Sequence, residues 1–341
     1  ILLMLGVLYF KGFGWIDNYV STITSHPIYS ALLFFGIIAL ISDILNLPFS
    51  LYSTFVIEEK YGFNRTSVKT YISDKLKGYI LGALIGGGLL ALFIWFYQLT
   101  GNNFWIYTWI AFGAFILLLT MFYSSVILPI FNKLEPLPAG ELRSAIENYC
   151  NKVGFKLENL FVMNGSKRSS KANAFFTGLG KKKTIVLYDT LIEKQTTEEL
   201  VAVLAHEIGH YKKKHTLYNS ILALLQLGLM LYLLSLFLNN PEFSFVLGAD
   251  KAKIHLGLIT FALLFSPISM ILGIFKNILS RKFEYEADRF AADTYKANSL
   301  QSALKKLSVN NLSNLNPHPL NIFIHYSHPP LLARLKALKG L

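Results

Sequence analysis

Long apolar stretches separated by polar loops are the dominant pattern of this chain. Crossing a bilayer takes about 20 apolar residues, and five stretches have about that length or more: residues 27–47, 78–99, 104–130, 216–238 and 254–279. Residues 1–10 are apolar but shorter, which indicates the end of a further span. Hydrophobic residues make up 53% of the chain and charged residues 15%, whereas soluble proteins are about 25% charged. We therefore expect a mainly α, polytopic membrane helix bundle.

Residues 131–196 break this pattern and predict a small α+β unit outside the membrane. Residues 141–153 have the polar, amphipathic pattern of a surface helix. Three short runs are typical of strands, at residues 159–163, 175–177 and 184–188. A glycine- and lysine-rich turn at residues 178–183 joins the last two strands.

The basic residues are distributed very unevenly between the two ends of the predicted spans. Of 32 lysines and arginines, 28 fall on one side, only Lys11, Lys251 and Lys253 fall on the other, and Lys276 lies inside the last predicted span. Positive loops stay in the cytosol, so the basic side is predicted to be cytosolic. The net charge of +12 is explained by these loops, and no nucleic-acid-binding motif accompanies it. Cys150 is the single cysteine, so no intramolecular disulfide can form.

The stretch His206-Glu207-Ile208-Gly209-His210 has the spacing of a metal site on a helix. Two histidines at i and i+4 lie on one helix face, from which both imidazoles can reach one Zn²⁺. Glu207 can then act as general base toward a zinc-bound water. The alternative is an amphipathic helix with two surface histidines and an incidental glutamate.

The helix that holds this motif is predicted to begin near residue 197, because Thr196 and Glu199 have the spacing of a capping box. We expect it to continue without a break to residue 238, a length of roughly 63 Å that exceeds the bilayer core. The motif would then lie in water and the lysines at 212–214 at the membrane surface. His215 falls off the ligand face. We expect it to be structural or on the surface, like four other histidines without an evident partner: His26, His255, His318 and His325.

A catalytic zinc takes three protein ligands and leaves one position for water. The spans at 216–238 and 254–279 form a hairpin, which brings the segment after residue 280 back beside the two histidines. Glu284 is the predicted third ligand, with Glu286 as an alternative that helical phase does not exclude. Asp288, at i+4 from Glu284, could accept a hydrogen bond from a ligating histidine. The alternative is a solvent-exposed helix on which these residues only form i, i+4 charge pairs.

Together, the His-Glu-Xaa-Xaa-His motif and the downstream Glu284-Xaa-Xaa-Xaa-Asp288 motif resemble the type I CaaX prenyl protease family of integral-membrane zinc metalloproteases. The similarity extends over nearly the whole chain. It includes residues 51–64, 165–170, 173–176, 185–191 and 328–331, together with Arg334.

The resemblance implies one Zn²⁺ per chain, held by His206, His210 and Glu284, with Glu207 activating the water. In this family, the residue that Asp288 matches is placed beside a ligand or acts as a proton donor.

The resemblance also implies residues that bind substrate. Asn173, Ala174 and Phe175 match the strand edge that pairs with the substrate backbone. His328 and Arg334 match residues near the scissile carbonyl, where a positive donor could stabilise the oxyanion.

The implied fold is a ring of seven membrane helices around a water-filled chamber, capped by the zinc domain. Since only part of a span precedes residue 11, the family's first helix and part of its second are expected to be absent here. We expect four parts. These are transmembrane helices with a cytosolic loop at 49–76 (residues 1–130), the cytosolic α+β part with the zinc-motif helix (131–215), a transmembrane hairpin (216–280) and the C-terminal part with the third ligand (281–341).

The function implied by the resemblance is removal of the last three residues from proteins that end in a prenylated CaaX motif and reach the enzyme through the lipid bilayer. The enzyme would be multi-pass, with its protease domain on the cytosolic side of the endoplasmic reticulum membrane in a eukaryote or of the inner membrane in a bacterium. No nucleic-acid partner is expected. A quality-control zinc protease without a prenyl requirement would share every motif. A polytopic transporter or scaffold with a structural zinc site is the alternative outside the enzymes.

Overall fold

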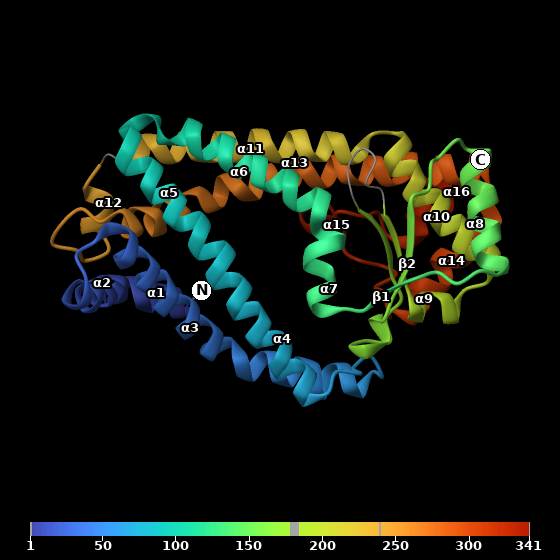
Figure 1. The fold of residues 1–341 in the computed structure, drawn as a ribbon, viewed down its shortest axis with the longest axis horizontal. Coiled ribbons are helices and arrows are strands. Elements are labelled where there is room, and N and C mark those ends of the chain that lie inside the picture. Colours follow the sequence, from blue (N-terminus) through green and yellow to red (C-terminus); the bar gives the residue numbers. More distant parts are fainter. Residues whose placement is uncertain (1, 178–183, 239, 341) are drawn as a thin grey trace. The chain divides into compact units, whose positions relative to one another are not determined.

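The computed structural model describes residues 2–177, 184–238 and 240–340 (Figure 1). The chain forms two compact units. One comprises Ile1–Val56, Ile72–Ile116 and Ile221–Ser269, and the other comprises Ile57–Tyr71, Leu117–Ser220 and Met270–Leu341.

The first unit consists of helices. Its elements are α1 (Leu2–Tyr9), α2 (Gly12–Ile23), α3 (Pro27–Tyr52), α5 (Gly87–Thr100), α12 (Glu242–Phe245) and parts of α4 (Val68–Leu81), α6 (Phe104–Phe122), α11 (His215–Phe237) and α13 (Ile254–Thr294). Phe13, Val20 and Phe34 pack with Leu256 in its core. The Nε2 atom of His255 lies 2.7 Å from the Oδ1 atom of Asp17, so this histidine has a buried structural partner.

Four helical stretches of the described chain are long and apolar enough to cross a membrane: Pro27–Glu58, Val68–Phe131, His215–Phe237 and Ile254–Thr294. The second stretch contains two of the spans predicted from the sequence. Short 3₁₀ and π-helical turns at Gly82–Gly86, Gly101–Asn103 and Tyr123–Ile127 link its α-helical parts. These helices bear out the mainly α, membrane-type fold expected from the apolar pattern.

The second unit contains a four-stranded sheet of β1 (Leu134–Pro136), β2 (Asn159–Met163), β3 (Ala174–Thr177) and β4 (Thr184–Tyr188). The strand order is β1-β2-β4-β3, with β2 and β4 parallel and both outer pairs antiparallel. Strand β3 therefore lies at an edge. The predicted strands at 159–163 and 184–188 are confirmed, and that at 175–177 begins one residue earlier. The predicted turn at 178–183 lies outside the described residues.

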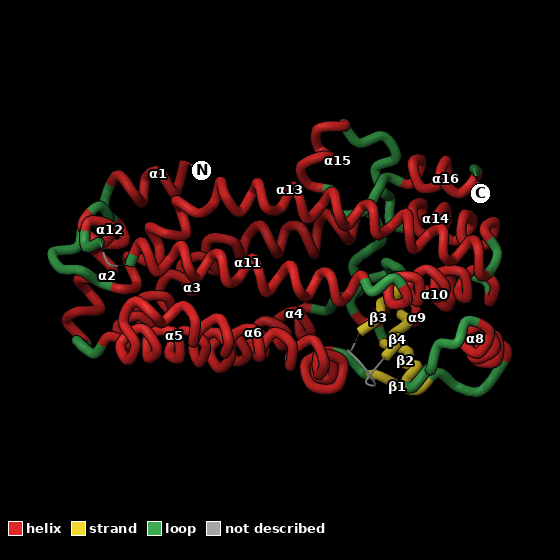
Figure 2. The backbone as a smooth tube through the Cα atoms, turned by 90° about the horizontal axis from the view of Figure 1, so that it is seen from above, coloured by secondary structure: helices red, strands yellow, loops and turns green. Residues whose placement is uncertain are grey.

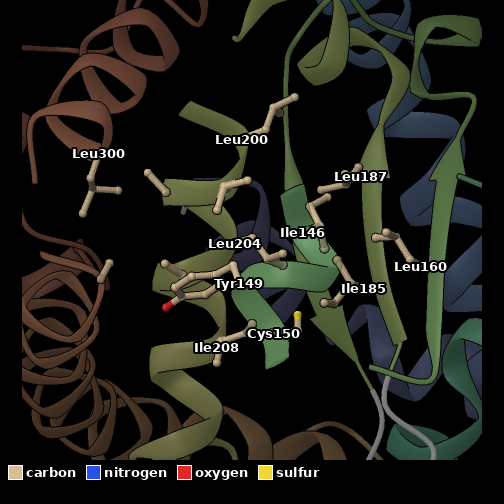
Figure 3. Packing of buried hydrophobic residues seen from close by; sticks show 14 of the residues in the cluster. Ile146, Tyr149, Cys150, Leu160, Ile185, Leu187, Leu200, Leu204, Ile208 and Leu300 are labelled. Atoms are coloured by element: carbon tan, nitrogen blue, oxygen red, sulfur yellow. The ribbon is translucent and has the colours of Figure 1, made fainter. Parts of the chain in front are cut away.

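The second unit also contains α7 (Leu128–Phe131), α8 (Glu141–Lys152), α9 (Asp189–Lys194), α10 (Thr197–Lys212), α14 (Ala297–Asn310), α15 (Pro319–His325) and α16 (Leu331–Lys339). Helix α9 packs on β4 and helix α10 on β3 (Figure 2). Ile146 of α8, Leu187 of β4, Leu204 of α10 and Leu300 of α14 belong to one buried cluster (Figure 3). Burial in this cluster raises the pKa of Cys150 to about 11, so this thiol is a structural residue of the core.

The expectation of one unbroken helix over residues 197–238 is wrong. Helix α10 ends at Lys212 and α11 begins at His215. Lys214 between them has φ 60, in the left-handed region that ends helices. The break redirects the chain, and it changes where His215 lies.

Candidate active site

Helix α10 holds three of the predicted site residues, and its start is well defined. Thr196 Oγ1 accepts a hydrogen bond from the Glu199 backbone N–H, and Glu199 Oε2 accepts one from the Thr196 N–H at 2.8 Å. This is the capping box predicted from the sequence. It fixes the helix two turns before His206, so the direction in which the motif faces is set by the helix rather than by a loop.

The structure brings His206, His210 and Glu284 together. The two Nε2 atoms lie 3.2 Å apart. Glu284 places Oε1 at 3.3 Å from His210 Nε2 and Oε2 at 3.5 Å from His206 Nε2. One possible ligand atom from each of the three residues lies within 4.8 Å of the others. The side chains of His206 and Glu284 are buried, and that of His210 is partly buried.

Close contact between α10 and α13 makes this cluster possible. Gly209 faces Ala287, and a Cβ atom at position 209 would lie 3.1 Å from both the Cα and the carbonyl oxygen of Ala287. A side chain at position 209 would push these atoms apart by a few tenths of an ångström, so glycine favours this close approach. Glu284 and Asp288 lie before and after Ala287 on α13. The close approach of α10 and α13 at Gly209 therefore places both carboxylates beside the histidines.

The cluster has the chemistry of a metal site. Glu284 Oε2 is buried and has no hydrogen-bond partner among the described residues. A buried carboxylate oxygen without a partner is costly, as are two ring nitrogens that face each other across 3.2 Å. A cation between these atoms would satisfy all of them. Two imidazoles and a carboxylate are also a donor set that divalent transition metals accept.

Asp288 and Arg334 lie beside Nδ1 of His206, the ring nitrogen that does not face the cluster. Asp288 Oδ1 lies 2.9 Å from His206 Nδ1, so it can accept a hydrogen bond from that nitrogen. Arg334 donates from Nε and Nη2 to the two oxygens of Asp288 at 2.8 and 2.6 Å. This bidentate pair holds the carboxylate in one orientation, which in turn fixes the ring of His206.

His210 is supported through a second histidine, which the sequence analysis missed. His215 Nδ1 lies 3.0 Å from His210 Nδ1, and His215 Nε2 lies 3.0 Å from Glu286 Oε2. The ring of His215 stacks on Phe283 at 4.0 Å and is 1% exposed. The expectation that His215 has no partner at the site is therefore wrong, because it assumed that α10 continues past Lys214. Glu286, the alternative third ligand, contacts His215 instead of the cluster.

Burial and nearby charges shift two pKa values on α10. Burial raises the pKa of Glu207, and the nearby histidines only partly oppose this effect. Burial lowers the pKa of His210, but its hydrogen bond to Glu284 and the charge of that residue outweigh burial and raise the pKa. A proton and a metal ion would therefore compete for the same nitrogen of His210.

A cavity of about 770 Å³ opens beside the cluster. Glu207 lines it, as do the residues at the β3 edge from Ala172 to Phe175. His328 lies at its mouth, with a side chain that is 66% exposed and an Nε2 atom 3.3 Å from Glu284 Oε1. Arg334 Nη1 lies 3.5 Å from Glu284 Oε2. All the site residues predicted from the sequence thus lie in or around one cavity.

Comparison with known proteins identifies the family. The family model described as CAAX prenyl protease N-terminal, five membrane helices, matches residues 1–133, and that of peptidase family M48 matches residues 136–341. This chain belongs to peptidase family M48. It is therefore a membrane metalloendopeptidase with several transmembrane helices, and membership implies a metal, for which His206, His210 and Glu284 are the candidate ligands.

Named relatives in family M48 agree with this assignment. The chain is 39% identical over 341 residues to the CAAX prenyl protease 1 homolog of Oryza sativa subsp. japonica, covering 98% of this chain and 80% of the relative. It is 35% identical over 367 residues to the CAAX prenyl protease 1 homolog of Homo sapiens, covering 96% and 77%. The crystal structure of S. mikatae Ste24p superposes with a TM-score of 0.93 at 35% identity, covering 99% of this chain and 83% of that one. The resemblance stated from the sequence is confirmed.

Proposed function

We propose that this chain is a zinc-dependent endopeptidase that removes the last three residues of proteins ending in a prenylated CaaX motif (a cysteine, two aliphatic residues and a final residue). The observation that carries this proposal is the convergence of His206, His210 and Glu284 beside Glu207 in one cavity. The substrate class comes from relatives named CAAX prenyl protease 1.

The proposed metal is one Zn²⁺ per chain, held by His206, His210 and Glu284. Two imidazoles and one carboxylate are a usual ligand set for catalytic zinc, and they leave one position for water or substrate. The bound zinc would polarise the peptide carbonyl and lower the pKa of the attacking water.

Glu207 is the proposed general base. It accepts a proton from the water that attacks the carbonyl carbon, and it donates that proton to the leaving amide nitrogen as the C–N bond breaks. Both steps need a carboxyl group whose two protonation states are close in free energy, and the raised pKa of Glu207 supports this.

The remaining predicted residues are proposed to hold the substrate and the catalytic groups. Strand β3 lies at the sheet edge, so backbone groups from Asn173 to Phe175 can pair with an extended peptide. His328 and Arg334 are proposed to donate to the carbonyl oxygen as it gains negative charge. For Asp288, the 2.9 Å contact with His206 supports a positioning role.

The location of the protein follows from the same proposal. A prenyl group prefers apolar surroundings, which suits a multi-pass membrane enzyme. The excess of lysine and arginine on one side favours a cytosolic protease unit, in the endoplasmic reticulum membrane of a eukaryote or the inner membrane of a bacterium.

The test uses purified protein, a farnesylated CaaX peptide and its unprenylated twin. Release of the C-terminal tripeptide is followed by mass spectrometry, with Glu207→Gln and a chelator as controls. Release that needs zinc and Glu207 and is faster with the prenyl group is expected. Equal cleavage of both peptides would instead indicate a quality-control protease. Zinc-loaded protein that cuts neither peptide would contradict the proposal and favour a transporter or scaffold.

A further inference from the structure

One wall of the active-site cavity is formed by a single face of α14 and the turn that follows it. The residues of α14 that line the cavity are Leu300, Leu304, Leu307 and Ser308, and Asn311 follows at the helix end. Their spacing places them on one stripe of the helix. None of them has a part in the proposed function above.

Two polar atoms on this stripe are buried and unpaired. Ser308 Oγ and Asn311 Oδ1 have no hydrogen-bond partner among the described residues. Ser308 as a whole is only 7% exposed. Buried polar side chains nearly always have a partner in native proteins, so an unpaired one in a binding cavity indicates where a ligand group is expected.

These side chains are not needed to end the helix. Asn311 N–H donates to the Leu307 carbonyl at 3.0 Å, and Ser313 N–H donates to the Ser308 carbonyl at 2.9 Å. Leu312 has φ 48, the left-handed conformation that closes such a turn. The backbone thus satisfies its own last carbonyls.

Helix α14 is also firmly held, so the stripe has a fixed position. Ser302 Oγ donates to Glu199 Oε1 at 2.6 Å, and Lys306 Nζ donates to Glu199 Oε2 at 2.7 Å. Glu199 belongs to the capping box of α10. The helix with the proposed base and the helix with the unpaired oxygens are therefore anchored to each other through one carboxylate.

The chemistry of the stripe selects a neutral donor as its ligand. The unpaired atom of Asn311 is an acceptor, and a serine hydroxyl can accept as well. Both lie at the C-terminal end of α14, where the helix dipole disfavours an anion. Arg334 is the only lysine or arginine among the described residues lining the cavity, and the proposed function assigns it to the carbonyl oxygen of the scissile bond. A peptide N–H fits these conditions, whereas a carboxylate does not.

We propose that Ser308 and Asn311 accept hydrogen bonds from backbone N–H groups of the substrate segment that follows the scissile bond. Leu304 and Leu307, which are partly buried, contact the aliphatic side chains of the same segment. This inference rests on the proposed function, in which the two residues after the prenylated cysteine are aliphatic. It assigns α14 the recognition of the tripeptide that is released.

The test replaces single substrate N–H groups. Two farnesylated peptides carry an ester in place of the amide before the second or the third residue after the scissile bond, which removes one N–H each. For the wild-type protein, at least one ester is expected to lower kcat/KM about tenfold relative to the parent peptide, the effect of losing one hydrogen bond in a buried site. In Ser308→Ala or Asn311→Ala, the parent peptide should be cut about as slowly as the wild type cuts the ester peptide. The ester penalty, which is the ratio of kcat/KM for the parent peptide to that for the ester peptide, should shrink to about twofold or less.

Controls separate recognition from folding. Asn310→Ala changes a neighbouring asparagine that does not line the cavity, and it should keep the full ester penalty. Zinc content and the melting temperature in detergent should be unchanged in Ser308→Ala. Asn311→Leu, which keeps the number and branching of the side-chain heavy atoms, replaces Asn311→Ala if the smaller residue impairs folding.

The outcomes distinguish the inference from the function on which it rests. Wild-type protein that cuts the parent peptide but shows no penalty for either ester would overturn the inference alone. An equal penalty in the wild type and in both variants would overturn it as well. Wild-type protein that does not cut the parent peptide would overturn the proposed function and the inference with it.

Discussion

His215 Nδ1 lies 3.0 Å from Nδ1 of His210, five residues earlier in the chain. This contact determines where the protons are if His210 offers its Nε2 lone pair to a metal. The Nδ1 of His210 must then carry a proton and donate it to His215 Nδ1. His215 is left with its proton on Nε2, which donates to Glu286 at 3.0 Å. Each candidate histidine ligand is thus oriented by a carboxylate, His206 directly by Asp288 and His210 through His215.

Removing His215 should weaken metal binding. In His215→Ala, His210 loses the acceptor that fixes its ring, and we expect zinc affinity to fall about 10- to 100-fold. Competition with a chelator of known affinity measures this without any substrate. Glu286→Gln should have a smaller effect in the same direction, because its amide oxygen can still accept from His215. His26→Ala, an exposed histidine elsewhere, is the control. Unchanged affinity in His215→Ala would rule out the orienting role.

Gly209→Ala should separate α10 from α13. Its Cβ atom would lie 3.1 Å from backbone atoms of Ala287 and 3.2 Å from the Phe290 ring, so one helix must shift. We expect a loss of about 1–3 kcal/mol of stability, together with lower zinc content. Gly273→Ala is the matched control in α13, because nothing lies within 4 Å of its added Cβ. That variant should be neutral or stabilised by about 0.5–1 kcal/mol. Equal melting temperatures for the two variants would contradict this account.

Glu207→Gln should lower the rate of catalysis without weakening metal binding. Glu207 lies outside the His206–His210–Glu284 cluster, so the variant is expected to keep its zinc. Losing the general base should lower kcat about 10²- to 10⁴-fold. Metal analysis and single-turnover cleavage on the same preparation check both statements. A variant that loses its zinc would show that Glu207 helps to hold the site together.

Glu199 should make stability depend on pH. Burial raises its pKa, but hydrogen bonds from Lys306, Ser302 and the Thr196 N–H outweigh burial and hold the pKa below its ordinary value. A carboxyl group with a lowered folded-state pKa stabilises the protein above its unfolded pKa of about 4.3. That contribution is lost as the pH falls through the lowered pKa.

Melting temperatures of the wild type and Glu199→Gln, recorded from pH 7 to pH 3, test this linkage. At pH 7 the variant should be less stable than the wild type by about 1–3 kcal/mol and should melt at a lower temperature. This difference in melting temperature should shrink toward pH 3. Glu198→Gln is the control, because the Glu198 side chain is 57% exposed and lies outside the capping box. A difference in melting temperature that stays constant over this pH range would contradict a stabilising role of the ionised Glu199 carboxylate.

The sequence by itself determined features that depend on neighbours along the chain. Apolar length indicated the membrane-spanning helices. The pair Thr196 and Glu199 marked the start of α10, because a capping box involves only one helical turn. The i, i+4 spacing of His206 and His210 put them on one face for the same reason. Short runs typical of strands located β2 and β4, and the motifs together identified the family.

Only the tertiary structure decided relationships between distant segments. Glu284 and Glu286 are equally good ligands in sequence. The packing of α13 against α10 places Glu284 beside His206 and His210, and it places Glu286 beside His215. One left-handed residue, Lys214, ended α10 and turned His215 toward His210, which no helical periodicity could show. The unpaired oxygens of Ser308 and Asn311 are visible only when α14 is packed against α10. In the first and third cases the decisive quantity is a distance between helices far apart in the chain, and in the second it is the backbone conformation of one residue. Local sequence patterns encode neither.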